Sequence, residues 1–375
     1  WDALVGDRGF PLMSWGFLAL LEESGSVRAG NGWSPAHLLA REGGRLVAAA
    51  PFYVKSHSWG EFVFDFEFAE AARRGGKSWY PKLVGMVPLT PAPAWRVATA
   101  AGRDADALAR IALGAASKAA REAALAGLHV LWPDLAEGER ARPRGASTWE
   151  HQAFLWTDRG WGRFEDMLGS FSKNMRRNVR REREAVRQAG IETRVLRAGE
   201  AAAVPGLLAL MADLYESHND KFGPWAAKFL ERDFFLRLPE FMPEGWAIAA
   251  GFEGRGPALP PEPVALAFLL EGKDRLYGRY WGALRDVDCL HFELCYYMPI
   301  EYALERGIRD FDPGMGSPHK ARRGFRSLLA PSYHAPFDRG MSTLMDRALS
   351  AINAEEAAAA AALDGELPYK ASSVR

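Results

Sequence analysis

The chain has 375 residues, and 47 Lys and Arg balance 47 Asp and Glu, so its formal net charge is zero. This balance argues against a protein whose whole surface attracts nucleic acid, so a binding site for a polyanion must be local. There are 2 cysteines, Cys289 and Cys295, which excludes a disulfide-rich scaffold and indicates packing thiols in a reducing compartment. At roughly 100–200 residues per domain, the length predicts about two domains.

No stretch reaches the ~18–20 uninterrupted apolar residues that cross a bilayer. The start, Trp1-Asp2-Ala3-Leu4, lacks the charged and apolar regions of a signal peptide. We therefore expect a cytoplasmic protein, with peripheral contact at the inner face of the membrane as a further option.

The first part of the chain predicts a helix after Ser14, a hairpin formed by 37–40 and 46–54 around Gly43-Gly44, and an Ala-rich helix over 104–126. A strand over 128–132 follows and ends at Pro133. The polar segment 137–147 is the expected linker, which closes a first domain at 1–145.

The second part predicts a similar plan. It begins with helices from about 163, over 172–188 and over 207–217, followed by strands over 246–251, 264–270 and 276–281 with a Pro-rich turn at 256–263. A helix over 291–305, ended by Gly307, then leads to a strand over 308–311 and a Gly-rich basic loop over 312–325. We assign 146–345 to a second domain and 346–375 to a C-terminal helix and tail.

Five phrases, in order, carry a family resemblance. They are Lys55-Ser56-His57-Ser58-Trp59-Gly60-Glu61-Phe62-Val63-Phe64-Asp65, Tyr80-Pro81-Lys82-Leu83, Tyr277-Gly278-Arg279-Tyr280-Trp281-Gly282, Leu290-His291-Phe292-Glu293-Leu294-Cys295-Tyr296-Tyr297 and His319-Lys320-Ala321-Arg322-Arg323-Gly324-Phe325. They resemble the bacterial predicted N-acyltransferases, which are related to the peptidoglycan-bridging Fem ligases of the tandem GNAT superfamily. One branch of that family resembles bacterial ceramide synthases.

The resemblance implies an α/β (α+β) fold of two tandem GNAT-like domains, each a mixed, mainly antiparallel sheet flanked by helices. It implies an N-acyltransferase that moves an acyl group from acyl-CoA or acyl-carrier protein to a primary amine, with a long-chain lipid amine such as a sphingoid base as one acceptor. The Gly-rich pyrophosphate loop of ordinary GNAT enzymes is missing between Trp281 and His291, which weakens the expectation of acyl-CoA. No tightly bound cofactor, no metal and no DNA partner are expected, and tRNA ranks below the carrier protein and CoA.

His57 and Glu61 lie four residues apart, and Asp65 follows four later. These three could converge on one cavity wall, where His57 would deprotonate the attacking amine and Glu61 would orient the imidazole or bind an ammonium. A histidine held by local hydrogen bonds is the alternative. The second matched phrase adds Tyr80 and Lys82 to the expected substrate-binding residues, and the aromatic residues of 59–68 with Trp79 and Tyr80 could line an apolar pocket or form core.

A loop with several cationic side chains follows the strand that ends near Asp312. Lys320 is the expected contact to a phosphate or an oxyanion, with His319 beside it as a second catalytic candidate. Arg322 and Arg323 would bind substrate. The alternative is a solvated surface loop that Asp312 ties down.

Arg279 alternates with aromatic residues on a predicted strand, which would place it on one face with Trp281. A buried arginine needs an anion, so Arg279 either binds substrate or pairs with Glu293. His291 and Glu293 open the following helix and are further substrate-binding candidates.

The predicted helix over 172–188 carries a cationic stripe, which could dock an acyl-carrier protein, CoA phosphates, tRNA or anionic lipid, or could be a solvated face. The stripe comprises Lys173, Arg176, Arg180, Arg183 and Arg187.

The leading hypothesis places His57 and Lys320 at one reacting bond, between the two halves of the chain. The second hypothesis is a Fem-like transferase that uses aminoacyl-tRNA and acts on a cell-wall precursor. The third is a non-catalytic binding protein with the GNAT fold.

Overall fold

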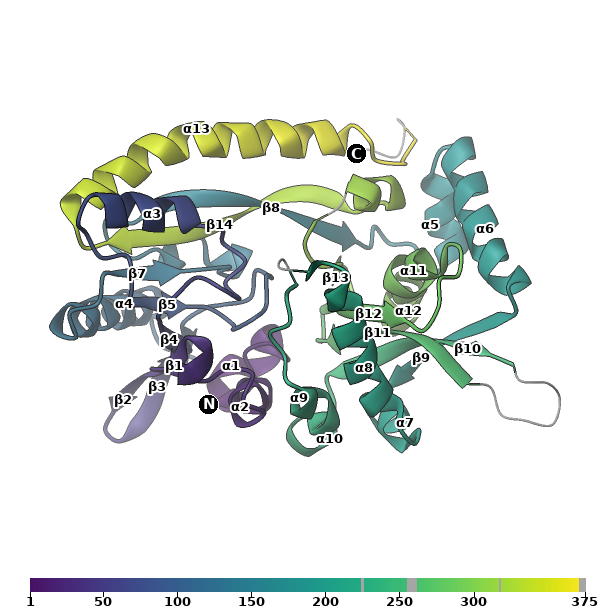
Figure 1. The fold of residues 1–375 in the computed structure, drawn as a ribbon, viewed down its shortest axis with the longest axis horizontal. Coiled ribbons are helices and arrows are strands. Elements are labelled where there is room, and N and C mark those ends of the chain that lie inside the picture. Colours follow the sequence, from purple (N-terminus) through teal and green to yellow (C-terminus); the bar gives the residue numbers. More distant parts are fainter. Residues whose placement is uncertain (224–225, 255–261, 317, 371–375) are drawn as a thin grey trace. The chain divides into compact units, whose positions relative to one another are not determined.

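The computed structural model describes residues 1–223, 226–254, 262–316 and 318–370. The chain divides into two compact units, Trp1–Ala153 with Leu329–Ala360 (unit 1) and Phe154–Leu328 with Ala361–Arg375 (unit 2) (Figure 1). The predicted division put the C-terminal helix in a segment of its own, whereas most of this helix lies in unit 1. The reason is apolar packing, because Met341, Met345 and Leu349 of the helix form a buried cluster with Phe68 and Trp79.

Unit 1 contains both helices and short strands. Its elements are α1 (Asp2–Gly9), α2 (Trp15–Glu23), β1 (Trp33–Pro35), β2 (Leu38–Glu42), β3 (Arg45–Ala50), β4 (Phe52–Lys55), α3 (Phe66–Arg74), β5 (Lys82–Gly85), β6 (Ala98–Thr99), α4 (Ala105–Glu122), β7 (Gly127–Val130), most of β8 (Ser147–Thr157), most of β14 (Arg326–Pro336) and most of α13 (Arg339–Asp364).

The main sheet of unit 1 has the strand order β1-β4-β5-β7-β14-β8, and β2-β3-β6 form a small second sheet. Helix α4 connects β5 to β7, which pair in parallel. Four alanines and one leucine on one face of α4 pack against this sheet, which explains why an Ala-rich helix is stable here: Ala109, Ala112, Leu113, Ala116 and Ala120 are buried.

Unit 2 contains the longer strands. Its elements are α5 (Phe164–Ser170), α6 (Lys173–Gln188), β9 (Ile191–Arg197), α7 (Ala198–Ala203), α8 (Leu207–Asp220), α9 (Arg232–Leu236), α10 (Leu238–Phe241), β10 (Trp246–Glu253), β11 (Glu262–Glu271), β12 (Arg275–Ala283), α11 (Leu290–Phe292), a π-helical segment (Glu293–Tyr297), α12 (Met298–Arg306), β13 (Asp310–Asp312) and a 3₁₀ helix (Pro318–Arg323).

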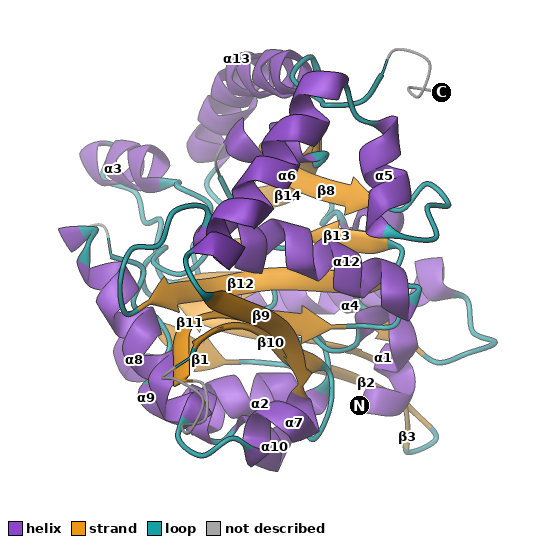
Figure 2. Cartoon of the chain, turned by 90° about the vertical axis from the view of Figure 1, so that its right-hand side faces the viewer, coloured by secondary structure: helices purple, strands orange, loops and turns teal. Residues whose placement is uncertain are grey.

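The sheet of unit 2 has the order β8-β13-β12-β11-β10-β9, in which β9 to β12 form an antiparallel meander. The segment α11–α12 then returns the chain to β13, which is parallel to β12. Helices cover both faces of the meander (Figure 2): Leu294 and Ile300 pack with Ala267 on one face, and Phe235 of α9 contacts Phe268 on the other. Each unit therefore contains two parallel strands joined by a helical crossover.

Most predicted elements are confirmed. Helix α2 begins after Ser14, whose hydroxyl accepts the Phe17 N–H at 3.2 Å. The helix before Gly307 ends there, and Gly307 has a φ of 67°. The Pro-rich turn over 256–263 lies mostly outside the described residues.

Three predictions are wrong in detail. The expected strand over 46–54 is divided at Pro51 into β3 and β4, which belong to different sheets. The expected linker over 137–147 includes most of a 3₁₀ helix, Leu135–Ala141, and the first residue of β8. The basic loop over 312–325 contains the 3₁₀ helix Pro318–Arg323.

Strands β8, β9 and β14 and helix α3 were not predicted from the sequence. Among the described residues, no helix combines the length and apolarity needed to cross a membrane.

Candidate functional site

Unit 1 contains a buried ionic cluster around Lys82, the first residue of β5. The Lys82 Nζ donates hydrogen bonds to Glu61 Oε2 at 2.8 Å, Asp65 Oδ2 at 2.6 Å and Ser58 Oγ at 2.8 Å. Ser58 also shares a 2.7 Å hydrogen bond with the Tyr80 hydroxyl. We call these five residues the Lys82 cluster. Four of the predicted site residues therefore meet here.

Burial and the charge of Lys82 act in opposite directions on the carboxylates of the Lys82 cluster. Burial raises the pKa of Glu61 to about 7, although Lys82 acts in the opposite direction. The pKa of Asp65 is lowered because Lys82 and the hydrogen bonds to its carboxylate together outweigh burial. Lys55, at the end of β4, is also buried, and burial lowers its pKa to about 7. Glu61 and Lys55 therefore both titrate near neutral pH.

His57 is not hydrogen bonded to Glu61 or Asp65, which the sequence predicted to share its cavity wall. Its Nδ1 accepts the backbone N–H of Trp59 at 3.3 Å. Its ring lies against Gly32, where an added Cβ would be 2.2 Å from His57 Nε2. Burial is the main cause that lowers the pKa of His57. The alternative prediction, a histidine held by a local hydrogen bond, matches this arrangement.

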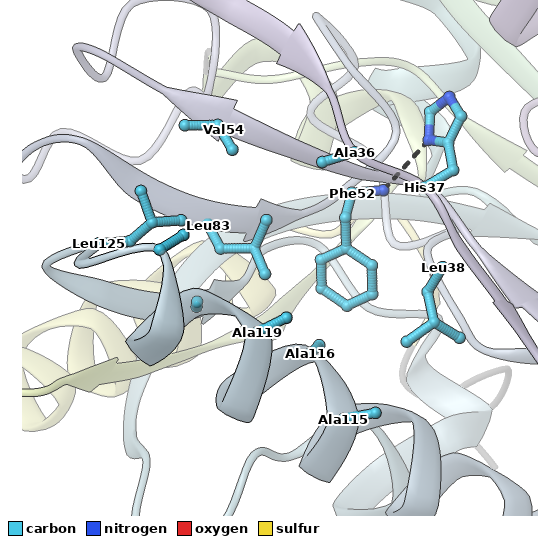
Figure 3. A pocket seen from close by; sticks show the side chains of 12 residues that line it. Ala36, His37, Leu38, Phe52, Val54, Leu83, Ala115, Ala116, Ala119 and Leu125 are labelled. Carbon is cyan, nitrogen blue, oxygen red and sulfur yellow. Dashed lines mark hydrogen bonds between the residues drawn. The ribbon is translucent and has the colours of Figure 1, made fainter.

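The aromatic run after β4 does not form one apolar pocket. Phe68 and Trp79 are buried with α13, whereas Trp59 and Phe64 are 44% and 63% exposed. A cavity of about 340 Å³ lies elsewhere in unit 1, between α4 and strands β4 and β5 (Figure 3). Its lining is almost entirely apolar and comprises Ala36, His37, Leu38, Phe52, Val54, Leu83, Ala115, Ala116, Ala119, Ala120, Ala123 and Leu125.

A hydrogen-bonded chain of histidines in unit 1 was missed by the sequence analysis. His129 Nδ1 lies 2.8 Å from His334 Nδ1, and Ser332 Oγ lies 2.7 Å from His334 Nε2 and 2.6 Å from His151 Nε2. These residues come from β7, β14 and β8. Because β8 and β14 were not predicted, no pattern in the sequence could bring them together.

In unit 2, Lys320 lies in the 3₁₀ helix after β13 and is 3% exposed. Its Nζ donates to the carbonyl oxygens of Gly314 and Met315, both at 2.7 Å, and no acceptor for its third proton is found among the described residues. Burial lowers the pKa of Lys320 to about 8, although Asp312 acts to raise it. The ammonium is therefore close to its titration range at neutral pH.

Arg279 lies on β12, and its Nη1 donates to Asp312 Oδ1 at 3.2 Å and to the Gly278 carbonyl at 2.8 Å. Asp312 Oδ1 also accepts the Gly314 N–H at 2.8 Å. The predicted pair of Arg279 with Glu293 is wrong. Asp312 is the partner because β12 and β13 run parallel and their register places Tyr277 beside Asp312.

Glu293 is instead held by Arg183 of α6, at 2.9 Å. Arg183 also pairs with Glu301 at 2.8 Å, so it joins α6 to α12 within unit 2. Burial raises the pKa of Glu293, against the opposing effect of Arg183.

Much of the predicted cationic stripe on α6 is engaged within the unit. Besides Arg183, Arg180 pairs with Glu165 at 2.6 Å, Arg187 pairs with Glu184 at 2.9 Å, and Arg176 donates to the Phe171 carbonyl at 2.9 Å. Within the described ranges, the exposed Lys173 has no ion pair.

Three other predicted residues of unit 2 take part in ring contacts, namely His291, Trp281 and His319. His291 packs edge-on against Trp281, with ring centroids 5.1 Å apart. Burial lowers the pKa of His291 to about 4, and Lys320 is one of several cations that act in the same direction. His319 is exposed, and its ring lies 6.1 Å from that of Phe292.

The two arginines after Lys320 have different environments. Arg323 is buried over the Phe292 ring at 3.5 Å and pairs with Glu182 at 2.9 Å. Arg322 is exposed and pairs with Glu366 at 2.8 Å. The basic segment is therefore not a simple solvated loop.

The whole chain is similar to known proteins in sequence pattern and in fold. The FemAB-like family model, described as peptidoglycan biosynthesis/recognition, matches residues 1–371. The crystal structure of FemX aligns with a TM-score of 0.54 and 10% identity over 92% of this chain and 96% of that chain. A conserved protein of unknown function from Bacteroides thetaiotaomicron aligns with a TM-score of 0.51 and 12% identity over 88% and 92%. A tandem GNAT protein from the clavulanic acid pathway has a TM-score of 0.41 and 13% identity over 87% and 94%.

No curated protein matches the chain by sequence. The likeness to FemX shows a shared fold, and the predicted mixed α/β fold class is confirmed.

Proposed function

Because the chain belongs to the FemAB-like family of peptidoglycan biosynthesis and recognition, we propose that it is a transferase that joins an activated acyl or aminoacyl group to a primary amine. The observation that carries this proposal is the environment of Lys320 in unit 2. A buried ammonium whose third proton has no acceptor in the described part of the chain is suited to stabilise negative charge that develops on a carbonyl oxygen.

The chemistry requires two things of the protein. The attacking amine must be neutral, and the oxyanion of the tetrahedral intermediate needs a hydrogen-bond donor. In this proposal the third proton of Lys320 Nζ donates to that oxyanion, while the carbonyls of Gly314 and Met315 fix the ammonium. Loss of one such donor typically costs about 10²–10³ in rate.

The family description supports a peptidoglycan precursor as the amine acceptor, which makes it the first acceptor to test. The donor is then an aminoacyl-tRNA, an acyl-CoA or an acyl-carrier protein. The engagement of Arg176, Arg180, Arg183 and Arg187 within unit 2 weakens the sequence-based argument that α6 docks the donor.

A lipid amine is the second candidate acceptor, and the apolar cavity beside α4 favours it (Figure 3). Apolar pockets of a few hundred Å³ are typical sites for small ligands, and each buried methylene contributes about 0.8 kcal/mol. The comparisons give no support to the narrower ceramide synthase-like branch.

The test is a transfer assay with the purified chain. Each donor class is combined with a peptidoglycan precursor and, separately, with a sphingoid base, and the new amide is detected by mass spectrometry. We expect an amide product in one combination, and a loss of about 10²-fold or more for Lys320→Met. Arg322→Met is the matched control, because Arg322 is an exposed cation of the same 3₁₀ helix.

Two outcomes oppose the proposal. Absence of amide in every combination would favour a binding protein without catalysis. Equal rates for Lys320→Met and Arg322→Met would remove Lys320 from the reaction.

A further inference from the structure

Arg279 has hydrogen-bond donors that the described structure does not satisfy. Its side chain is 4% exposed, and its Nε and Nη2 atoms are buried without a hydrogen-bond partner. Within the described ranges, only Nη1 is used, by Asp312 and the Gly278 carbonyl. Buried donors of a charged group are almost always paired, because an unpaired one keeps the full cost of its lost hydration.

The two unused nitrogens form one edge of the guanidinium. Nε–H and one N–H of Nη2 point in the same direction, and this is the edge that binds two oxygens of one carboxylate or phosphate side by side. A lone acceptor would satisfy only half of it. The pattern of used and unused atoms therefore indicates a partner that presents two oxygens together.

Local backbone geometry presents this edge. Phe268 of β11 pairs with Tyr280 of β12, and the next residue, Leu269, pairs with Gly278. Arg279 is therefore an extra residue without a partner on β11. Such β-bulges re-aim a side chain and occur next to active sites. The bulge also interrupts the regular alternation of side chains along β12, on which the prediction that Arg279 and Trp281 share one face depends.

The surrounding charges favour an anion. Arg279 and Lys320 are two buried cations, and Asp312 supplies one carboxylate next to them. Asp312 contacts the Nη1 side of Arg279, away from the unused edge. These three groups together carry one net positive charge in a buried setting, and a buried charge is costly without a counter-ion.

We propose that the Nε–Nη2 edge of Arg279 is a bidentate binding site for a carboxylate or phosphate group of the substrate. This proposal rests on the proposed function, since it names the group that orients a substrate near Lys320. Gly314 lies next to the guanidinium on its Nη1 side, because a Cβ added at Gly314 would be 3.7 Å from Nη1. Arg279 is then a specificity-determining residue, separate from the oxyanion donor.

The direct test follows the Nε–H resonance of Arg279 in nitrogen-15 spectra of the full chain. The resonance is assigned by its loss in Arg279→Lys, and the wild-type chain is titrated with acetate and, separately, with inorganic phosphate. We expect a saturable shift with one of the two anions, which tells a carboxylate site from a phosphate site. Arg309→Gln is the matched control, because Arg309 is an arginine with an exposed side chain that pairs with Asp310. We expect the Arg279 resonance of this variant to shift with the anion as in the wild type.

An Arg279 resonance that is observed and stays constant with both anions would overturn the proposal and indicate an internal water instead. Because this binding is read without transfer, anion binding in a chain that forms no amide would contradict only the proposed function.

If transfer is observed, Arg279→Lys should raise KM for one substrate by about tenfold or more and change kcat less, since Lys cannot supply a two-donor fork. An unchanged KM for both substrates would contradict the site.

Discussion

Removal of the Lys82 ammonium should destabilise unit 1 strongly. Lys82 and both carboxylates of its cluster are 0% exposed, and Lys82 donates three hydrogen bonds of 2.6–2.8 Å. Lys82→Met leaves Glu61 and Asp65 buried without their cation, and breaking a buried pair in this way costs about 3–5 kcal/mol. Glu61 has a pKa of about 7 and so takes up a proton readily, whereas the pKa of Asp65 is lowered, so Asp65 carries most of the cost.

The assay is urea unfolding of the full chain, with hydrogen exchange of β5 amides to assign the change to unit 1. Lys77→Met is the matched control in the same unit, because Lys77 is 51% exposed in its pair with Asp338 and should contribute less than about 1 kcal/mol. If the two variants lose similar stability, the argument from burial is wrong.

The remaining predictions concern pH and packing. Burial raises the pKa of Glu61 from 4.5 to about 7, so the folded state holds an extra proton between these pH values. The free energy of unfolding should therefore fall as pH rises from 4.5 to about 7, and Glu61→Gln should flatten this dependence in denaturant titrations. Burial lowers the pKa of Lys55 from 10.5 to about 7, so stability should rise with pH between 7 and 10.5, and Lys55→Met should abolish that rise. Gly282→Ala should destabilise unit 2 by about 1–3 kcal/mol in thermal unfolding, because its Cβ would lie 2.6 Å from the Leu214 carbonyl oxygen, and a neutral result would contradict this close approach. The transfer rate should fall as pH rises through about 8, where Lys320 loses its proton. If the pH–rate profile of Lys320→Arg shows the same fall near pH 8, another group causes it.

Local signals in the sequence predicted most of the helices. Such signals act within a few residues. The Ser14 hydroxyl caps the start of α2 and Gly307 ends α12, and the glycine pair Gly43-Gly44 likewise forms the turn of the β2–β3 hairpin. Strands β8 and β14 were not predicted because their partners are far away in the chain: β14 pairs with β7, about 200 residues earlier.

The same distinction holds for the candidate sites. Glu61, Asp65 and Lys82 were all identified as candidates, but their meeting at one ammonium depends on how β5 lies beside the loop after β4. The partner of Arg279 depends on the parallel register of β12 and β13, and its bulge was not predicted although Gly278, a glycine inside the strand, lies beside it. The histidine chain requires three strands, two of which were not predicted.

Single-turnover amide formation tests the central claim most directly. The chain is mixed in excess with a labelled donor, a saturating primary amine is added, and the amide is quantified over time for the wild type and Lys320→Met. We predict one amide per donor at a rate that falls at least ~100-fold in Lys320→Met while donor binding persists. Amide formation at the same rate in both proteins would contradict the account.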